Sequence, residues 1–282
     1  MRFCSLASSS RGGNAYLVEG GDGTRVLVDC GLGIRRLEAS LLELGVVPQT
    51  LSGVLVTHDH RDHVRALWVR RPFTAKHGVP LLASEATLFS LEVSGPADHL
   101  GETQAVRPGE TVRVGGLDVL PFLKPHDAPD PLGFLLDDGS SRLGVVTDLG
   151  RVDPATARFL EDCTYLIFEA NHDVRMELAS GRPQHLIDRV LGDIGHLSNE
   201  QAARALAEIV GRTTRLVVLA HLSDECNLPE LAFSTVSRAL DQAGYAGRLA
   251  VAPLFGPSCV FSAENAPRSA RPAAAAGGTT RG

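Results

Sequence analysis

The sequence predicts an α/β fold built in layers. Short runs rich in β-branched residues and leucine recur along the chain, bounded by Gly, Asp, Pro or Ser, which is the pattern of β-strands. Helical patterns lie between some of these runs. Because the strand-like runs are apolar throughout, we expect both faces of their sheets to be covered, with helices on the outside.

The expected elements can be placed one after another along the chain. The main strand-like segments are Ala15–Val18, Arg25–Asp29, Gly53–Thr57, Val119–Phe122, Leu143–Thr147, Tyr165–Phe168 and Leu216–Leu219. One helix is expected over Leu37–Leu44, because Gly45 suits a C-terminal cap. Another is expected to open at Ser198-Asn199-Glu200, to run from Gln201 to Val210 and to stop at Gly211.

We expect residues 1–263 to form a single domain and residues 264–282 to form a flexible C-terminal tail. No internal repeat divides the chain. The stretch from Pro267 to Gly282 is almost free of large apolar residues, so it cannot bury enough surface to offset its ordering entropy.

The composition excludes several classes of protein. With 44% apolar and 21% charged residues in a chain of 282, an intrinsically disordered protein is excluded. No apolar run reaches the ~20 residues needed to span a bilayer, so no membrane segment is expected. The five cysteines include no Cys-x-x-Cys pair, and the first residues lack the apolar core of a signal peptide. We therefore expect free thiols and a cytoplasmic location.

Most of the strand-like runs end in a side chain that can bind a metal ion or transfer a proton. Strand ends on one edge of a sheet converge in space, so we expect these side chains to meet around a common point. They are Asp29, the segment from His58 to His63, His126, Asp148, Glu169 and His221.

The densest cluster is His58-x-His60-x-Asp62-His63, with four potential metal ligands within six residues. A loop can wrap such a segment so that two histidines face one ion and the Asp-His pair faces a second. Imidazole nitrogen and carboxylate oxygen suit zinc, manganese or iron, whereas the lack of nearby cysteine disfavours a structural thiolate site. The isolated histidines are interpreted as ordinary surface or core residues: His77, His99 and His185.

Several motifs follow this cluster in a fixed order: a later His, an Asp in Thr147-Asp148-Leu149-Gly150, and a final His. Together they resemble the metallo-β-lactamase fold. Five segments resemble the bacterial YycJ/WalJ nuclease-like subgroup: Ser5 to Asn14, His126-Asp127-Ala128, Glu169 to Asp173, Gly195 to Asn199 and Leu219 to Ser223. The chain departs from the family pattern at Ala66, at Cys226 and in Ser8-Ser9-Ser10, but no ligand position is lost.

The resemblance implies a four-layer αβ/βα sandwich with a dinuclear metal site at the sheet edge. It implies that one ion is held by His58, His60 and His126, the second by Asp62, His63 and His221, with Asp148 bridging the two. Asp29 matches a residue that supports the ligand loop from behind. Two ions ~3.5–4 Å apart can hold a bridging hydroxide nucleophile and stabilise both sides of an in-line displacement, which suits phosphodiester hydrolysis. Two divalent ions per chain, manganese or zinc, are therefore the expected cofactors.

His196 lies where phosphodiesterases of this superfamily place a histidine that is not a ligand. We expect it to contact the scissile phosphate and to protonate the leaving oxygen, with Glu169 orienting it and favouring its charged form. His196, Glu169 and Asp62 are thus the expected catalytic residues. Asn171 and Asp173 are expected to support the site. The alternative for Gly195-His196 is a simple turn before a helix.

The resemblance favours a DNA exonuclease, with DNA preferred to RNA as the nucleic-acid substrate. Arg61, Arg65, Arg70 and Arg71 would form a basic rim beside the metal loop and complement a phosphate backbone, despite the net charge of −6. A solvated charged surface is the alternative interpretation of these arginines.

Two other functions are open on the sequence. One is a small-molecule hydrolase on the same ions, either a cyclic phosphodiesterase or a hydrolase of thioesters, lactones or β-lactams. The other is a binding protein with an inactive site, which the complete set of expected ligands disfavours.

Overall fold

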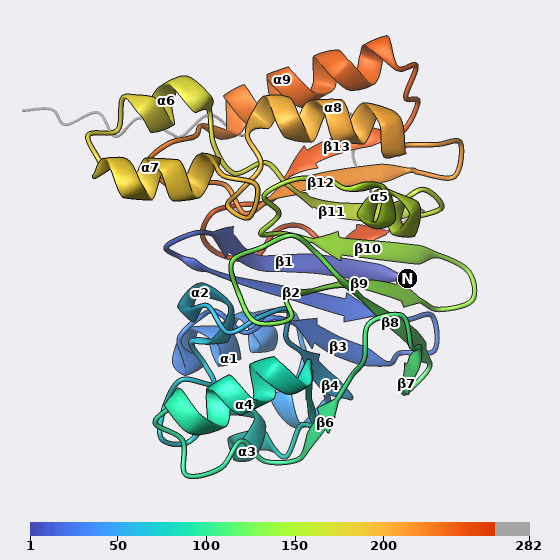
Figure 1. Ribbon diagram of the computed structural model, residues 1–282. Coiled ribbons are helices and arrows are strands. Elements are labelled where there is room, and N and C mark those ends of the chain that lie inside the picture. Colours follow the sequence, from blue (N-terminus) through green and yellow to red (C-terminus); the bar gives the residue numbers. More distant parts are fainter. Residues whose placement is uncertain (263–282) are drawn as a thin grey trace, which may run out of the picture.

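The computed structural model describes residues 1–262, which form two seven-stranded sheets packed face to face (Figure 1). In spatial order the first sheet comprises β14 (Phe261–Ser262), β1 (Arg2–Ser9), β2 (Gly13–Glu19), β3 (Arg25–Val28), β4 (Gly53–Leu55), β5 (Leu81–Ala83) and β6 (Thr103–Ala105). The second comprises β13 (Arg248–Val251), β12 (Leu216–Ala220), β11 (Tyr165–Glu169), β10 (Arg142–Val146), β9 (Leu132–Asp137), β8 (Leu117–Leu123) and β7 (Val112–Val114). The expected tail, residues 264–282, lies outside the described residues.

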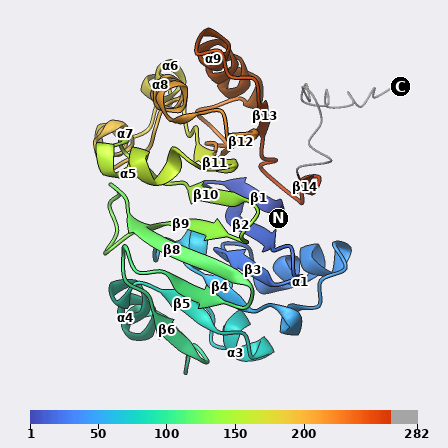
Figure 2. The ribbon, with the colours of Figure 1, turned by 90° about the vertical axis from the view of Figure 1, so that its right-hand side faces the viewer.

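Helices cover the outer face of each sheet, so the molecule has four layers (Figures 1 and 2). Those beside the first sheet are α1 (Ile34–Glu43), α2 (Arg61–Val64), α3 (Phe73–His77) and α4 (Glu85–Ser94), with a 3-10 turn at Pro48–Thr50. Those beside the second are α5 (Pro154–Leu160), α6 (Val174–Leu178), α7 (Gln184–Leu191), α8 (Asn199–Ile209) and α9 (Pro229–Gln242). The predicted four-layer sandwich is confirmed.

Three apolar clusters fill the spaces between the four layers. The central one lies between the sheets and includes Tyr16 of β2 and Phe134 of β9, both fully buried. A second joins the first sheet to its helices through residues such as Leu37 of α1. The third includes Leu206 of α8 and Val236 of α9, which pack on the second sheet. The strands buried on both faces are those that the sequence shows as continuous apolar runs.

The direction of the strands gathers their carboxyl ends at one edge. β3 and β4 run parallel in the first sheet, and β10, β11 and β12 run parallel in the second. β8 and β10 are both antiparallel to β9, so β8 ends on the same side as β10. The loops after these strands therefore lie close together, as the sequence predicts.

The two predicted helices form with small shifts at their ends. α1 begins at Ile34, earlier than expected, and Gly45 follows it with a φ of 71°, which favours glycine. α8 begins after Ser198, whose side chain and that of Gln201 form a reciprocal capping box. None of the helices within residues 1–262 has the length and hydropathy to cross a bilayer. All five cysteines are free thiols.

Candidate metal centre

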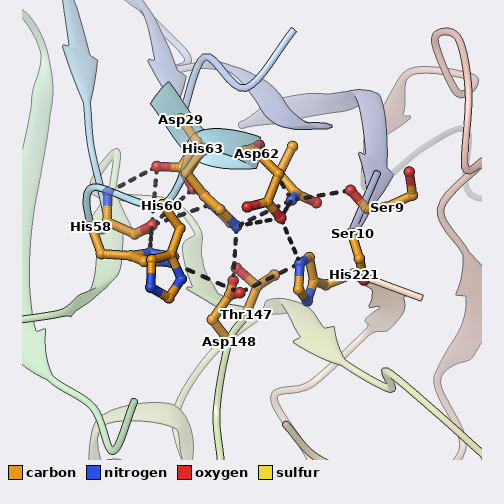
Figure 3. Close-up of polar contacts among 12 residues, drawn as sticks. Ser9, Ser10, Asp29, His58, His60, Asp62, His63, Thr147, Asp148 and His221 are labelled. Carbon is orange, nitrogen blue, oxygen red and sulfur yellow. Dashed lines mark hydrogen bonds and ion pairs between the residues drawn. The ribbon is translucent and has the colours of Figure 1, made fainter. Parts of the chain in front are cut away.

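The predicted cluster assembles on loops that leave the strands of both sheets (Figure 3). His58 and His60 lie in the loop after β4, and Asp62 and His63 follow within α2. The remaining members follow strands of the second sheet: His126 after β8, Asp148 after β10 and His221 after β12. Side chains that are far apart in the sequence thus converge at the seam between the sheets.

Three histidines form one potential metal-binding group, called here the three-histidine group. One ring nitrogen from each of His58, His60 and His126 lies within 4.8 Å of the others. The Nε2 atom of His126 is 3.2 Å from Nδ1 of His60, close to the ~3.3–3.4 Å that separates two nitrogen ligands on a tetrahedral zinc ion. The Nδ1 atoms of His58 and His126 pair with Thr57 Oγ1 at 2.8 Å and with the Gly195 carbonyl at 3.2 Å. Their Nε2 atoms are therefore left to face the centre.

A second group, called here the Asp–His group, comprises Asp62, His63, Asp148 and His221, whose ligand atoms also lie within 4.8 Å of one another. Asp62 Oδ2 is 3.2 Å from His221 Nε2, and Asp148 Oδ2 is 3.1 Å from His63 Nε2. Asp148 Oδ1 lies 3.4 Å from His221 Nε2 and 3.8 Å from His126 Nε2. One carboxylate therefore faces both groups.

The backbone at these strand ends is held in an uncommon conformation. Asp29, Asp148 and His221 have φ angles of 60°, 56° and 55°, in the left-handed region that non-glycine residues rarely adopt. Such a conformation costs about 1–3 kcal/mol and persists where the surroundings determine it. Asp29 shows the reason, because its carboxylate accepts from the Thr57 amide and pairs with His63 Nδ1, both at 2.8 Å. Asp29 thus holds the segment from Thr57 to His63 in place.

The two groups differ in their electrostatics. Burial holds the pKa of His58 well below its ordinary value and lowers the pKa of His126 to about 3, so both imidazoles are neutral, as metal binding requires. Burial also opposes charge on His221, but Asp148, Asp62 and Glu169 outweigh it and raise its pKa to about 10. In the Asp–His group, the protons on His63 and His221 balance the negative charge of the carboxylates. A bound divalent cation would supply this positive charge in place of the protons.

Glu169, at the end of β11, connects His196 to this centre. Its fully buried carboxylate accepts from His196 Nδ1 at 2.9 Å and from His221 Nδ1 at 2.8 Å. It also accepts three backbone N–H groups, those of Asp148, Leu149 and Leu197. These interactions lower the pKa of Glu169, so the carboxylate is ionised. The expected contact with His196 is present, and the same carboxylate also fixes the ring of His221.

Three residues near the centre were missed by sequence reasoning. Asn14 Nδ2 lies 3.2 Å from Asp62 Oδ2 and 3.1 Å from His63 Nε2. Lys124 is buried and donates to the carbonyl oxygens of Thr147 and Asp148 at 2.6 and 2.9 Å. Asp127 forms an ion pair with Arg189, and its Oδ1 atom is buried without a hydrogen-bond partner. Asn14 and Asp127 lie in the motifs quoted above, so a signal existed for both.

The two expected supporting residues lie in different surroundings. Asn171 Nδ2 donates to the His221 carbonyl at 2.8 Å and lies 3.3 Å from Ser10 Oγ. The carboxylate of Asp173 instead accepts the Met176 amide at 2.9 Å and caps α6. Asn171 thus contacts the centre directly, whereas the side chain of Asp173 acts on the helix.

The four arginines of the expected rim differ in their contacts. The Arg61 guanidinium lies over the Trp68 ring, 5.2 Å from its centroid, beside the metal loop. Arg65 donates to the Arg11 carbonyl at 3.1 Å. Arg70 is highly exposed and pairs with Asp98 at 3.3 Å, so that its charge is partly neutralised. Arg71 is exposed.

The residues present fit divalent metal ions. The Nε2 atom of His58 is buried without a hydrogen-bond partner, which is costly unless a ligand such as a metal occupies that direction. The donor set combines imidazole nitrogen and carboxylate oxygen and contains no thiolate, which suits a catalytic site rather than a structural zinc site. Most of the ring nitrogens that face away from the centre already have partners, as expected for metal-binding histidines.

Four layers and a histidine–carboxylate cluster at the sheet edge define a class, the metal-dependent hydrolases with the metallo-β-lactamase fold. The solved structure of Zn(2+)-bound PqqB from Methylobacterium extorquens has the same fold, with a TM-score of 0.69 and 19% identity, covering 93% of this chain and 100% of that one. Residues 24–222 match the beta-lactamase superfamily domain.

Comparison with curated proteins gives the group within this class. The exodeoxyribonuclease YycJ of Bacillus anthracis is 32% identical over 245 residues, 87% of this chain and 91% of the relative. The exodeoxyribonuclease WalJ of Streptococcus pneumoniae is 34% identical over 249 residues, 86% and 89% of the two chains. A ribonuclease Z of Methanopyrus kandleri is 33% identical over a shorter 135 residues, 46% and 47%. The chain belongs to the beta-lactamase superfamily, in the YycJ/WalJ group. The predicted class, a metal-dependent hydrolase of phosphodiester bonds, is confirmed.

Proposed function

We propose that this protein is a metal-dependent exonuclease that hydrolyses the phosphodiester bonds of DNA. The observation that carries the proposal is the placement of His196 by Glu169, beside Asp148 and His221, in a third group whose ligand-type atoms lie within 4.8 Å of one another. A phosphodiesterase needs such a proton donor beside its ions. Relatives named exodeoxyribonucleases match over 86–87% of the chain, whereas those named ribonuclease Z match over 46–65% of it, which supports DNA.

The proposed metal ligands follow from the two groups. One ion would be held by His58, His60 and His126 and the second by Asp62, His63 and His221, with the Asp148 carboxylate available to both. Bound divalent ions would lower the pKa of a coordinated water and stabilise charge on the phosphate. Nitrogen and oxygen donors suit both zinc and manganese. The proposed cofactors are therefore two ions of one of these metals per chain.

His196 is the proposed acid for the leaving oxygen. Its Nδ1 is held by Glu169, so Nε2 is the nitrogen free to meet a substrate, and the side chain is 14% exposed at the surface of the site. The Glu169 carboxylate fixes the orientation of the ring. Asp62 is the more exposed carboxylate of the Asp–His group, with 19% of its side chain accessible against 2% for Asp148. We assign to Asp62 the acceptance of the proton from the attacking water.

The proposed contacts to the phosphate backbone come from Arg61 and Arg65, which lie next to the metal loop. Arg70 and Arg71 extend this rim along the following segment. Backbone contacts of this kind confer affinity without sequence readout, which suits an enzyme that degrades DNA from its ends.

The test is cleavage of end-labelled linear DNA by metal-stripped protein to which Mn²⁺ or Zn²⁺ is restored. We expect metal-dependent release of nucleotides by the wild type and by His99→Ala, since His99 is exposed and lies outside the cluster. We expect none from His60→Ala. A circular DNA of the same sequence should resist cleavage, because an exonuclease needs an end.

Other outcomes would change the assignment. Preferential cleavage of an RNA of the same sequence would show that the substrate is RNA and not DNA. Cleavage of a cyclic nucleotide with DNA left intact would establish the small-molecule phosphodiesterase instead. Equal activity of His60→Ala and the wild type would show that the reaction does not depend on the metal centre.

A further inference from the structure

An exposed aromatic side chain packs on the turn that leads to Asn14, a residue in contact with the metal centre. Phe255 lies in the segment between β13 and β14 and is 59% exposed. The segment is attached to β1, because the Ser8 amide donates to the Pro253 carbonyl at 3.2 Å and the Ser258 amide donates to the Ser5 carbonyl at 2.7 Å. Phe255 is therefore an exposed ring on a segment that backbone hydrogen bonds hold against β1.

The ring packs on the turn that joins β1 to β2. A Cβ atom added at Gly12 would lie 2.8 Å from Phe255 Cε1, so only a glycine allows this approach. The Gly12 amide donates to Ser9 Oγ at 2.7 Å within the same turn. Asn14, which follows the turn, contacts Asp62 and His63 of the Asp–His group. The chain between β1 and β2 thus contacts Phe255 through Gly12 and the Asp–His group through Asn14.

One arginine lies over the exposed ring, and a second contacts the turn on which the ring packs. The Arg36 guanidinium lies 5.8 Å from the Phe255 centroid, within the range of a cation–π contact. Arg36 is exposed and, within residues 1–262, forms no ion pair. Arg65 contacts the same turn through the Arg11 carbonyl. Arg11 itself is paired with Glu225 at 2.6 Å, so the available charge comes from Arg36 and Arg65.

We propose that Phe255 and Arg36 form a stacking platform for an unpaired nucleobase of the DNA strand whose phosphate reacts at the metal centre. This inference rests on the proposed nuclease function. A nucleic-acid strand offers flat bases beside negative phosphates, which matches an exposed ring with one cation over it and a second on the adjacent turn. Stacking on an aromatic ring tolerates every base, and it requires a base that is free of its partner strand. The platform therefore favours single-stranded or frayed ends.

The experiment measures binding and turnover separately. Phe255→Ala should weaken the binding of a short single-stranded oligonucleotide about tenfold, measured in Ca²⁺ to prevent cleavage. Phe255→Trp should retain binding, because the indole also stacks. The matched control is Phe89→Ala, since Phe89 is 66% exposed on α4 and should have no effect. Turnover of bis(p-nitrophenyl) phosphate, which has no nucleobase, should be the same in all four proteins.

An abasic site tests stacking directly. Wild-type protein should lose about the same tenfold in affinity when the base at one position of the oligonucleotide is removed, and Phe255→Ala should lose nothing further at that position. Equal affinities of Phe255→Ala and Phe89→Ala, with DNA cleavage intact, would overturn the platform and leave the nuclease. A wild type that neither binds nor cleaves DNA would overturn both.

Discussion

Four of the five histidines of the metal centre are oriented through the nitrogen that faces away from it. His58, His63, His126 and His221 pair that nitrogen with Thr57, Asp29, the Gly195 carbonyl and Glu169. Asp127 Oδ1 lies 3.9 Å from Nε2 of the fifth, His60, and 3.4 Å from Nε2 of His126. An ion pair with Arg189 holds the Asp127 carboxylate in place. Because this Oδ1 atom accepts no hydrogen bond, it is an available acceptor for the outer nitrogen of His60.

Replacing Asp127 by Ala should weaken the binding of one of the two ions by about 10–100-fold, because His60 loses the carboxylate that fixes its ring. Isothermal titration of metal-stripped protein with Mn²⁺ measures this affinity. Asp118→Ala is the control, since Asp118 pairs with Arg113 on the exposed edge of the second sheet. An unchanged affinity in Asp127→Ala would show that His60 is held by packing alone.

His196→Ala should leave the metal content near that of the wild type while slowing DNA cleavage by about 10²–10⁴-fold. The reason is that His196 is proposed to protonate the leaving oxygen, whereas the ligand atoms of the two metal-binding groups remain. A substrate with a p-nitrophenolate leaving group needs little protonation, so its turnover should fall much less. Loss of both ions in this variant would identify His196 as a ligand instead.

Single residues differ in how far the sequence could predict their place. The members of the two metal-binding groups were predictable, because strand ends converge and the resemblance fixes their order. Lys124 was not, because a lysine at the end of an apolar strand has the same pattern whether it is exposed or buried. Only the fold shows that its ammonium group donates to the Thr147 and Asp148 carbonyls. The position of Phe255 likewise depends on its contact with Gly12, which is far away in the sequence.

Among the secondary-structure elements, α8 connects the stability of the fold to the position of His196. Its capping residue Ser198 stands two positions after His196 and accepts from the Gln201 amide at 3.2 Å. Ser84 caps α4 in the same way, accepting from the Thr87 amide at 3.2 Å, on the helical layer of the other sheet. The two serines are equally buried, so they form a matched pair.

Ser198→Ala and Ser84→Ala should each lower the free energy of unfolding by about 1 kcal/mol, measured by urea denaturation. Only Ser198→Ala should also slow DNA cleavage, because the loop that carries His196 leads directly into α8. Equal cleavage by both variants would mean that the His196 loop is held by Glu169 and not by the helix cap.

The elements themselves were predicted well where the apolar pattern was continuous. The segments at β10, β11 and β12 match the expected runs to within one residue at each end. The short helix α6 has no comparable pattern over its five residues, and the amphipathic pattern of α7 extends over only eight. They follow Asp173 and Pro183, local signals that sequence periodicity does not record.

At the scale of the whole molecule, the metal centre joins the two sheets. The first sheet supplies the ligand-type residues that follow β4, and the second supplies those after β8, β10 and β12. Without ions, the carboxylates are balanced by protons on His63 and His221. Bound ions would replace these protons and connect both halves of the sandwich. Metal binding should therefore stabilise the fold against global unfolding.

Adding Mn²⁺ to metal-stripped protein at 100 times its Kd should add about 2.7 kcal/mol to the free energy of unfolding for each ion bound. For a chain of this size each such increment corresponds to a rise in Tm of about 5 °C in a thermal melt. Asp148→Ala should lose most of this rise, because Asp148 is the proposed bridge between the two ions, while His99→Ala should keep it. Each variant is compared with its own metal-free form, so a change in basal stability does not enter. A full rise in Asp148→Ala would place the stabilising ions outside this centre.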